Sequence, residues 1–153
     1  MAGKLQSELK QTKPFGSKGQ EAILGLWRTA DQVRRVAARK LEPHGVTLQQ
    51  YNILRILRGA GKDGIPTLAI GERLIEETPG ITRLLDRMEA KQWVRRERCP
   101  RDRRQVLCYL TPQGRDLLSG LDSSMSRLDQ QTLSMLSEAE IDSLIAILDK
   151  IRG

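Results

Sequence analysis

Arginine and lysine side chains gather in one stretch of the sequence, and their chemistry is the binding of anions. From Arg83 to Arg104 the chain carries nine basic and four acidic residues, an excess of +5 within a total formal charge of +7. Arginine predominates there, and its planar guanidinium group can donate two parallel hydrogen bonds to a phosphate or a base edge. Such a cluster favours a nucleic acid as the partner, although a run of charges can also be only a solvated surface.

The first part of this stretch has the pattern of an amphipathic helix. Thr78 is predicted to cap it and Pro79 to occupy its first position, where no backbone amide is needed. Apolar residues at helical spacing form its predicted buried face: Ile81, Leu84, Leu85 and Met88. The opposite face carries the hydroxyl and guanidinium groups that read base edges in a major groove. The predicted contact residues are Thr78, Gly80, Thr82, Arg83 and Arg87, with Arg83 as the first candidate for a guanine contact.

The second part changes to the alternating pattern of a β-hairpin. Apolar residues at every second position end at Leu110, and a turn is predicted over residues 100–104. The arginines of this turn are expected to enter a minor groove, where narrow A·T-rich tracts concentrate negative potential. Asp102 is expected to pair with a neighbouring arginine and hold the loop in shape. The predicted contact residues of the turn are Arg101, Asp102, Arg103 and Arg104.

The remaining segments are predicted to be helices that position these two elements. A long helix is expected over residues 20–41, and capping boxes at Thr47–Gln50 and Ser137–Glu140 begin two others. Thr67 is expected to cap a short helix that turns Leu68 and Leu74 inward. The predicted fold is mainly α with a small β-hairpin wing, in the order four helices, hairpin, two helices. We expect a polar N-terminal arm (1–18), a helical dimerisation region (19–46 and 112–153) and a winged helix-turn-helix domain (47–111).

Apolar stripes on the first and last helices predict a homodimer. They exceed what a small DNA-binding core can cover, so two copies are expected to cover them around a two-fold axis, with an intramolecular bundle as the alternative. The predicted interface residues are Leu118, Leu121, Ile141, Leu144, Leu148 and Ile151. Trp27 and Tyr51 are candidates for lining an apolar crevice between the two regions, against the alternative that each is ordinary core.

Several classes of function find no support in the sequence. No nucleophile elbow, phosphate loop or metal-ligand cluster is present, so neither an enzyme nor a cofactor or metal is predicted. No apolar run is long enough to cross a bilayer, and two cysteines fit a reducing compartment, so a cytoplasmic location is expected. Two Trp, two Tyr and one Phe are too few for base-stacking platforms, which favours double-stranded DNA.

From about residue 20 to 151 the chain resembles the MarR family of bacterial and archaeal regulators. The resemblance rests on three motifs: Leu48-Gln49-Gln50-Tyr51-Asn52-Ile53-Leu54; Ile81-Thr82-Arg83-Leu84-Leu85-Asp86-Arg87-Met88-Glu89; and Pro100-Arg101-Asp102-Arg103-Arg104 followed by Leu110-Thr111-Pro112-Gln113-Gly114. It implies a winged helix-turn-helix dimer on a pseudo-palindromic operator. It further implies that Asp102 and Arg104 form the family's wing pair, that Arg103 or Arg104 enters the minor groove, and that a small aromatic or phenolic ligand binds in the crevice.

Two positions depart from the family pattern. Gln92 stands where glycine commonly follows the recognition helix, so the left-handed helix cap is expected to be strained or absent. Cys99 stands where an acidic residue is frequent, which changes the charge at the entrance to the wing.

The predicted function is a sequence-specific, double-stranded DNA-binding transcription regulator, in the first place a repressor. A non-specific architectural DNA binder is the main alternative, because positive charge alone gives affinity for any duplex. A thiol-based redox regulator is a weaker one. A turn centred on residue 102 would place Cys108 opposite position 96 and Cys99 opposite position 105, too far apart for a disulfide.

Overall fold

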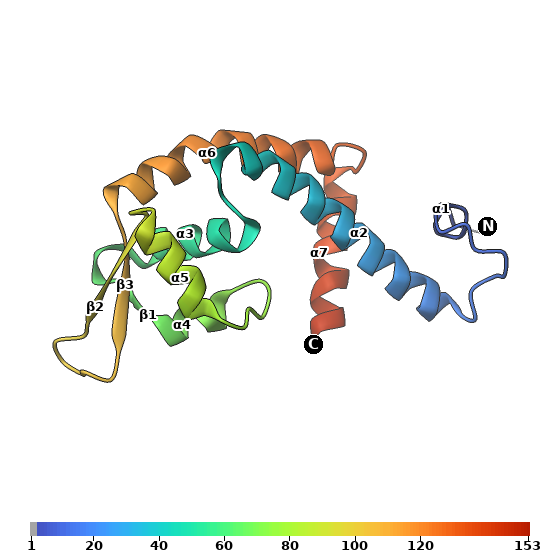
Figure 1. Cartoon of the computed structure of the whole chain (residues 1–153). Helices are drawn as coiled ribbons and strands as arrows, with labels where there is room; N and C mark the ends of the chain where they lie inside the picture. The colour runs from blue at the N-terminus through green and yellow to red at the C-terminus, as the bar shows by residue number, and fades with distance from the viewer. Residues whose placement is uncertain (1–2) are drawn as a thin grey trace.

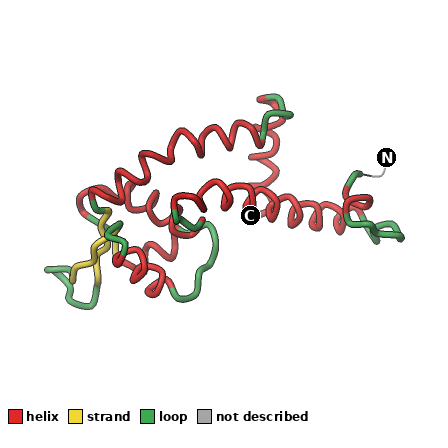
Figure 2. Tube along the Cα trace, turned by 45° about the horizontal axis from the view of Figure 1, so that its top comes forward, coloured by secondary structure: helices red, strands yellow, loops and turns green. Residues whose placement is uncertain are grey.

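The computed structural model describes residues 3–153 and confirms the predicted fold class (Figure 1). Its elements, in chain order, are α1 (Leu5–Glu8), α2 (Lys18–Leu41), the 3-10 turn η1 (Glu42–His44), α3 (Leu48–Ala60), η2 (Gly61–Asp63), β1 (Ile65–Pro66), α4 (Thr67–Arg73), α5 (Ile81–Ala90), β2 (Val94–Arg98), β3 (Val106–Leu110), α6 (Pro112–Thr132) and α7 (Glu138–Arg152). The strands lie at the end of the molecule away from the N-terminus (Figure 2). Within residues 3–153, no helix combines the length and apolar character needed to pass through a lipid bilayer.

The helix starts follow from side chains that satisfy free backbone amides. The Thr47 hydroxyl accepts from the Gln50 amide at 3.2 Å, and the Gln50 side chain accepts from the Thr47 amide at 3.0 Å. Ser137 and Glu140 form the same reciprocal pair at the start of α7. Both predicted capping boxes are therefore confirmed. They could be predicted because these contacts depend only on residues close in sequence.

The N-terminal segment, predicted to be a polar arm, contains the one-turn helix α1. The Leu5 side chain lies against α2 at Gly25, where a β-carbon added to the glycine would be 3.6 Å from Leu5 Cδ2. Residues 1 and 2 of the predicted arm lie outside the described residues.

A three-stranded sheet replaces the predicted two-stranded hairpin. β2 and β3 pair antiparallel with Arg96 opposite Cys108, the register expected for a turn centred on residue 102. On the other side of β3, Ile65 of β1 pairs with Cys108. The prediction missed β1 because two residues are too short for an alternating pattern to show.

Two apolar clusters form the core. The larger joins α3, α4, α5, the sheet and the start of α6, and it contains Ile53, Leu54, Leu57, Ile65, Ile70, Leu85, Met88, Val94, Cys108 and Leu118. The smaller joins the end of α2 to α6 and contains Leu41, Val46, Leu121 and Met125. Buried apolar area of this kind is the main stabilising contribution to a fold of this size.

Three predictions about apolar side chains were wrong. Leu118 and Leu121, expected at a dimer interface, are buried in this chain's own core with 0% and 2% exposure. The stripe on α6 packs against α2 and α3, so its first half is already covered within one copy. Leu68, expected to point inward, is 85% exposed, and Ile70 fills the core instead.

The start of α6 is held close to the end of α5. The Thr111 amide donates to the Trp93 carbonyl at 3.1 Å, and the Thr111 hydroxyl also accepts from the Gly114 amide at 3.0 Å to cap α6. A β-carbon on Gly114 would lie 2.2 Å from the Trp93 carbonyl oxygen, so only glycine fits there. The Thr111-Pro112-Gln113-Gly114 motif thus fixes where α6 leaves the sheet.

Gln92 adopts the left-handed conformation that the sequence prediction held to be strained or absent. Its φ angle is 62°. The Trp93 amide donates to the Met88 carbonyl at 3.0 Å and the Gln92 amide to the Glu89 carbonyl at 2.9 Å, which is the Schellman pattern of a helix end. The helix cap is therefore complete. Its left-handed position is held by a residue with a β-carbon, which is less favourable there than glycine.

Gln92→Gly is expected to raise the free energy of unfolding by about 0.5–1 kcal/mol, because glycine adopts a positive φ without a β-carbon clash. Urea denaturation at one fixed protein concentration measures the change. Gln92→Ala is the matched control, since it removes the same side chain but keeps the β-carbon. Equal stability of the glycine and alanine variants would show that the positive φ costs nothing here.

Candidate nucleic-acid interface

α5, the candidate recognition helix, begins two residues later than the sequence predicted. Its N-cap is Gly80 with a φ of 77°, a left-handed angle that favours glycine. The Thr78 hydroxyl donates to the Glu76 carbonyl at 3.2 Å instead of capping a helix. The prediction that Thr78 and Pro79 start the helix was therefore wrong, and Thr78 lies half-buried in the preceding loop.

The two faces of α5 divide as predicted. Leu85 and Met88 are fully buried, with Ile81 and Leu84 packed beside them. On the opposite face, Thr82, Arg83 and Arg87 are exposed. Within residues 3–153 neither of these two arginines has an ion-pair partner, so both guanidinium groups are available to a ligand.

Both acidic residues of α5 pair with Arg96 of β2, whose single positive charge offsets one of their two negative charges. Its guanidinium group pairs with Asp86 and, at 3.3 Å, with Glu89, while its backbone amide donates to Glu89 at 3.0 Å. The Arg96 side chain is only 18% exposed. The hydrogen bond to Glu89 and, to a smaller extent, the hydrogen bond to Asp86 raise the pKa of its guanidinium group. Arg96 therefore reduces the repulsion that two free carboxylates on α5 would exert on an anion bound by its arginines.

Sequence reasoning counted Arg96 among the basic residues but missed this role. The available signal was the two-residue alternation of β2, which puts Arg96 on the same face as buried Val94 and opposite Cys108.

The tip of the wing, residues 99–105, is shaped by backbone hydrogen bonds. The Asp102 carboxylate accepts from the Arg104 amide at 3.0 Å, and the Asp102 carbonyl accepts from the Gln105 amide at 3.0 Å. Arg98 donates to the Arg103 carbonyl, also at 3.0 Å. Asp102 thus meets Arg104 through its backbone amide, and no Asp102 ion pair with an arginine side chain occurs in the described part of the chain.

The arginine side chains of the wing tip, Arg101, Arg103 and Arg104, are exposed, and no ion pair with them is found from residue 3 onward. Thr82 of α5 and Arg104 of the wing border one surface hollow. The structure therefore brings the start of α5 and the wing tip to one place on the surface.

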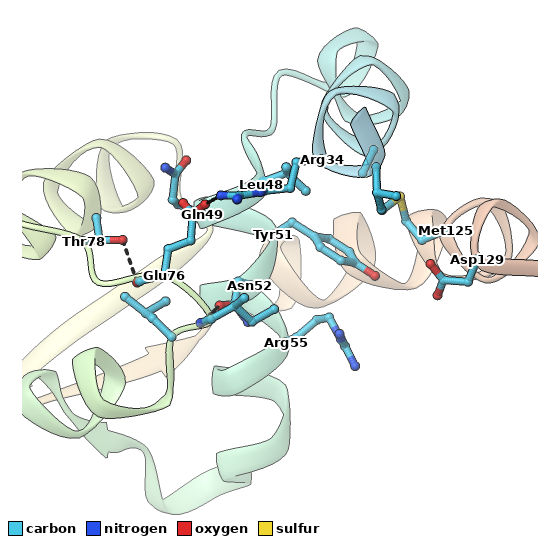
Figure 3. Close-up of a pocket in the computed structure, with 14 residues that line it drawn as sticks. Arg34, Leu48, Gln49, Tyr51, Asn52, Arg55, Glu76, Thr78, Met125 and Asp129 are labelled. Atoms are coloured by element: carbon cyan, nitrogen blue, oxygen red, sulfur yellow. Dashed lines mark hydrogen bonds and ion pairs between the residues drawn. The ribbon is translucent and has the colours of Figure 1, made fainter. Parts of the chain in front are cut away.

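A separate pocket of about 240 Å³ lies where α2, α3, α6 and the loop before α5 meet. Its walls are largely apolar, with Val33, Ala37, Leu48, Leu74, Ile75 and Met125. Tyr51 extends across it with Arg34 and Arg55 on either side (Figure 3). Burial raises the pKa of the Tyr51 hydroxyl, so this group stays neutral at physiological pH.

Trp27 does not line the pocket with Tyr51, which corrects that prediction. It is 66% exposed, ten residues before Ala37 on α2. Arg34 of the same helix reaches the pocket and forms an ion pair with Glu76 in the loop before α5. The pocket therefore contacts both the first long helix and the segment that leads into the recognition helix.

The two cysteines are free. As the hairpin register predicted, Cys108 lies opposite Arg96 and Cys99 lies opposite Gln105, so the two thiols do not face each other. Cys108 is buried, and burial raises the pKa of its thiol to about 11. The reactive thiolate form of Cys108 is thus scarce at neutral pH. Cys99 is half-buried, and its backbone amide donates to the Gln105 carbonyl at 2.9 Å.

A helix with free arginines beside a three-stranded sheet and an arginine-tipped hairpin defines the winged-helix class of DNA-binding folds. The model of the MarR family matches residues 46–106. A MarR transcription factor from Planctomyces limnophilus is 36% identical, with a TM-score of 0.69 over 89% of this chain and 98% of that one. The chain belongs to the MarR family.

Two further relatives are described in terms that bear on function. HTH-type transcriptional regulator TtmR of Methylorubrum extorquens is 34% identical over 74% of this chain, which spans 58% of that regulator's length. MepR of S. aureus, solved as a complex with DNA, is 28% identical, with a TM-score of 0.75 over 82% of this chain and 93% of that one.

Proposed function

We propose that this protein is a transcription regulator, in the first place a repressor, that binds a pseudo-palindromic operator in double-stranded DNA as a homodimer. The observation that carries the proposal is the free state of Arg83 and Arg87 on a helix whose two carboxylates are both paired with Arg96. The helix enters the major groove, and Arg103 or Arg104 of the wing enters the adjacent minor groove.

The relatives support this role. TtmR is a transcriptional regulator, and MepR has been solved with DNA. Proteins of this family are named as regulators, which supports a function without catalysis. In the proposal, residues 47–111 bind DNA, and residues 19–46 and 112–153 hold the two copies together.

Arg83→Ala is expected to lower affinity for the operator by about 10- to 100-fold while leaving affinity for random duplex nearly unchanged, because a bidentate contact to guanine is lost. The operator is first selected from a pool of random duplexes, and fluorescence anisotropy at constant salt measures both affinities. Arg127→Ala, at an exposed arginine of α6, is the control and should leave both unchanged. An equal loss on both duplexes would favour the architectural alternative, in which Arg83 contacts only phosphate.

The homodimer is supported by the apolar surface that one copy leaves uncovered. α7 has no buried residue, and Leu144, Ile145, Ile147 and Ile151 are 37–56% exposed. Leu148 and Ile141 are half-buried on the same helix. On α2, the apolar residues Ile23 and Trp27 are 42% and 66% exposed. α2 and α7 together therefore offer an apolar surface that a second copy would cover.

Light scattering at micromolar concentration is expected to give twice the chain mass of 17.3 kDa. The double variant Ile147→Glu and Ile151→Glu is expected to shift the population toward monomers, because carboxylates would be buried at the interface. Lys150→Glu, on the same helix, is the control for added negative charge. A wild-type monomer would contradict the proposal and remove the reason to expect a palindromic operator.

We further propose that a small aromatic or phenolic anion binds in the pocket at Tyr51 and releases the protein from DNA. The apolar walls suit an aromatic ring, and Arg55, whose guanidinium carbon lies 5.9 Å from the Tyr51 ring centre, offers positive charge beside it. The thiol-based alternative is weakened by the burial and raised pKa of Cys108.

4-Hydroxybenzoate is expected to raise the melting temperature and weaken operator binding, and Arg55→Ala is expected to reduce both effects. Differential scanning fluorimetry and anisotropy give the two readouts. Cyclohexanol, which matches the ring size without its aromaticity or charge, is the control ligand. Stabilisation that survives unchanged in Arg55→Ala would contradict a site at this pocket.

A further inference from the structure

A surface hollow lies between α4, the start of α5 and the wing. Its cavity volume is about 430 Å³. Six of its lining residues carry the inference: Thr67, Leu68 and Glu72 from α4, Thr82 from α5, and Arg104 and Gln105 from the wing. α4 and the start of α5 therefore meet the wing, which follows them in the chain, at one place on the surface (Figure 1).

Leu68 is the unusual residue of this hollow. Its side chain is 85% exposed, whereas Ile70, two residues later on the same helix, is completely buried. The adjacent Thr67 hydroxyl donates to the Val106 carbonyl of β3 at 3.3 Å, which ties the start of α4 to the wing. Leu68 is thus held at the hollow by the structure around it, with nothing in residues 3–153 covering most of its side chain.

The proposed mode of DNA binding determines what can cover it. One sugar–phosphate strand separates a major groove from the adjacent minor groove. If α5 occupies the first and the wing tip the second, that strand must pass between Thr82 and Arg104, which is where the hollow lies. The hydroxyl of Thr82, the guanidinium group of Arg104 and the amide of Gln105 can donate to a phosphate.

The hollow also has an apolar and an acidic side. Leucine offers a deoxyribose ring an apolar contact but can make no hydrogen bond with a phosphate. Glu72, exposed on α4, has no ion-pair partner among the described residues and would face the same strand. A carboxylate at this place lowers affinity for any duplex, and the repulsion depends on ionic strength.

We propose that this hollow seats one sugar–phosphate segment of the duplex, with Leu68 packed on the deoxyribose and Glu72 limiting affinity by repulsion. The proposal rests on the proposed function for the placement of α5 and the wing. It assigns opposing roles to two residues of α4, Leu68 and Glu72, neither of which depends on base sequence.

Two variants test it on the full-length protein, with anisotropy on the selected operator and on random duplex. Leu68→Ser is expected to lower both affinities by the same factor, about three- to tenfold, because an apolar contact is lost. Glu72→Gln is expected to raise both by about threefold at low salt, and the gain should vanish at high salt because added ions screen the charge. Neither variant should change the ratio of operator to random affinity.

Matched controls lie at the turn between α6 and α7. Met135→Ser replaces an apolar side chain that is 91% exposed, and Glu138→Gln removes one exposed negative charge. Both should bind DNA as the wild type does. Thermal melting should show Leu68→Ser to be as stable as wild type, since its side chain is already in solvent.

Three results would overturn the proposal. The first is that both variants bind DNA with wild-type affinity. The second is a changed ratio of operator to random affinity in Leu68→Ser, which would mean a base contact, and the third is a changed mass of Leu68→Ser in light scattering, which would mean a protein contact. Failure of the proposed function is distinguishable. In that case the wild type would not prefer any duplex, and weaker binding of random duplex by Leu68→Ser with tighter binding by Glu72→Gln would still support the hollow as a DNA contact.

Discussion

The ion pairs of Arg96 with Asp86 and Glu89 connect the two elements of the proposed DNA-binding surface. Arg96 belongs to the wing, and the two carboxylates belong to the recognition helix, so these contacts fix the helix against the sheet. The single positive charge of Arg96 also offsets one of the two negative charges on the helix that presents Arg83 and Arg87. Surface ion pairs usually contribute little to stability, but this guanidinium group is mostly buried and binds two carboxylates at once. Its importance is therefore geometric and electrostatic, since it links the helix to the wing and reduces the negative charge on the helix that carries Arg83 and Arg87.

A second set of contacts links this surface to the helices proposed to form the dimer. The Thr111 amide bonds the Trp93 carbonyl just after α5, and Gly114 allows α6 to approach the same carbonyl. Arg58 of α3 binds Asp122 of α6 through two hydrogen bonds of 2.8 and 3.1 Å, and this contact lowers the pKa of the Asp122 carboxyl. The path from α6 to α5 thus consists of short, directional contacts. In the proposed dimer, the position of α6 would set the separation of the two recognition helices, and that separation determines which operator spacing fits.

Local signals in the sequence were sufficient for the two capping boxes and for the hairpin register, because a capping box or a tight turn involves residues within a few positions of each other. The predicted cap at Thr67 was wrong, since Pro66 is the N-cap of α4. Thr78-Pro79 misled for the same reason: it has the local pattern of a helix start, but the loop uses the Thr78 hydroxyl on Glu76 and Gly80 supplies the cap. The stripe on α6 predicted burial correctly but not its partner, since periodicity marks an apolar face without saying whether α2 and α3 or a second copy will cover it. Arg96 and β1 required the tertiary arrangement, because their partners are distant in sequence or the segment is too short.

Net charge located the candidate site, but pairing decides which of its charges can bind a ligand. Of the nine basic residues between Arg83 and Arg104, four are occupied within the chain. Arg96 is paired with carboxylates, Arg95 pairs with Glu97 and stacks 4.1 Å from the Tyr109 ring centre, Lys91 donates to the Gly45 carbonyl, and Arg98 to the Arg103 carbonyl. The side chains of the other five, Arg83, Arg87, Arg101, Arg103 and Arg104, make no ion pair in the described part of the chain. They lie only on the exposed face of α5 and at the wing tip. The fold therefore uses the other four in contacts within the chain and leaves the unpaired arginines on the two elements proposed to enter adjacent grooves of a duplex.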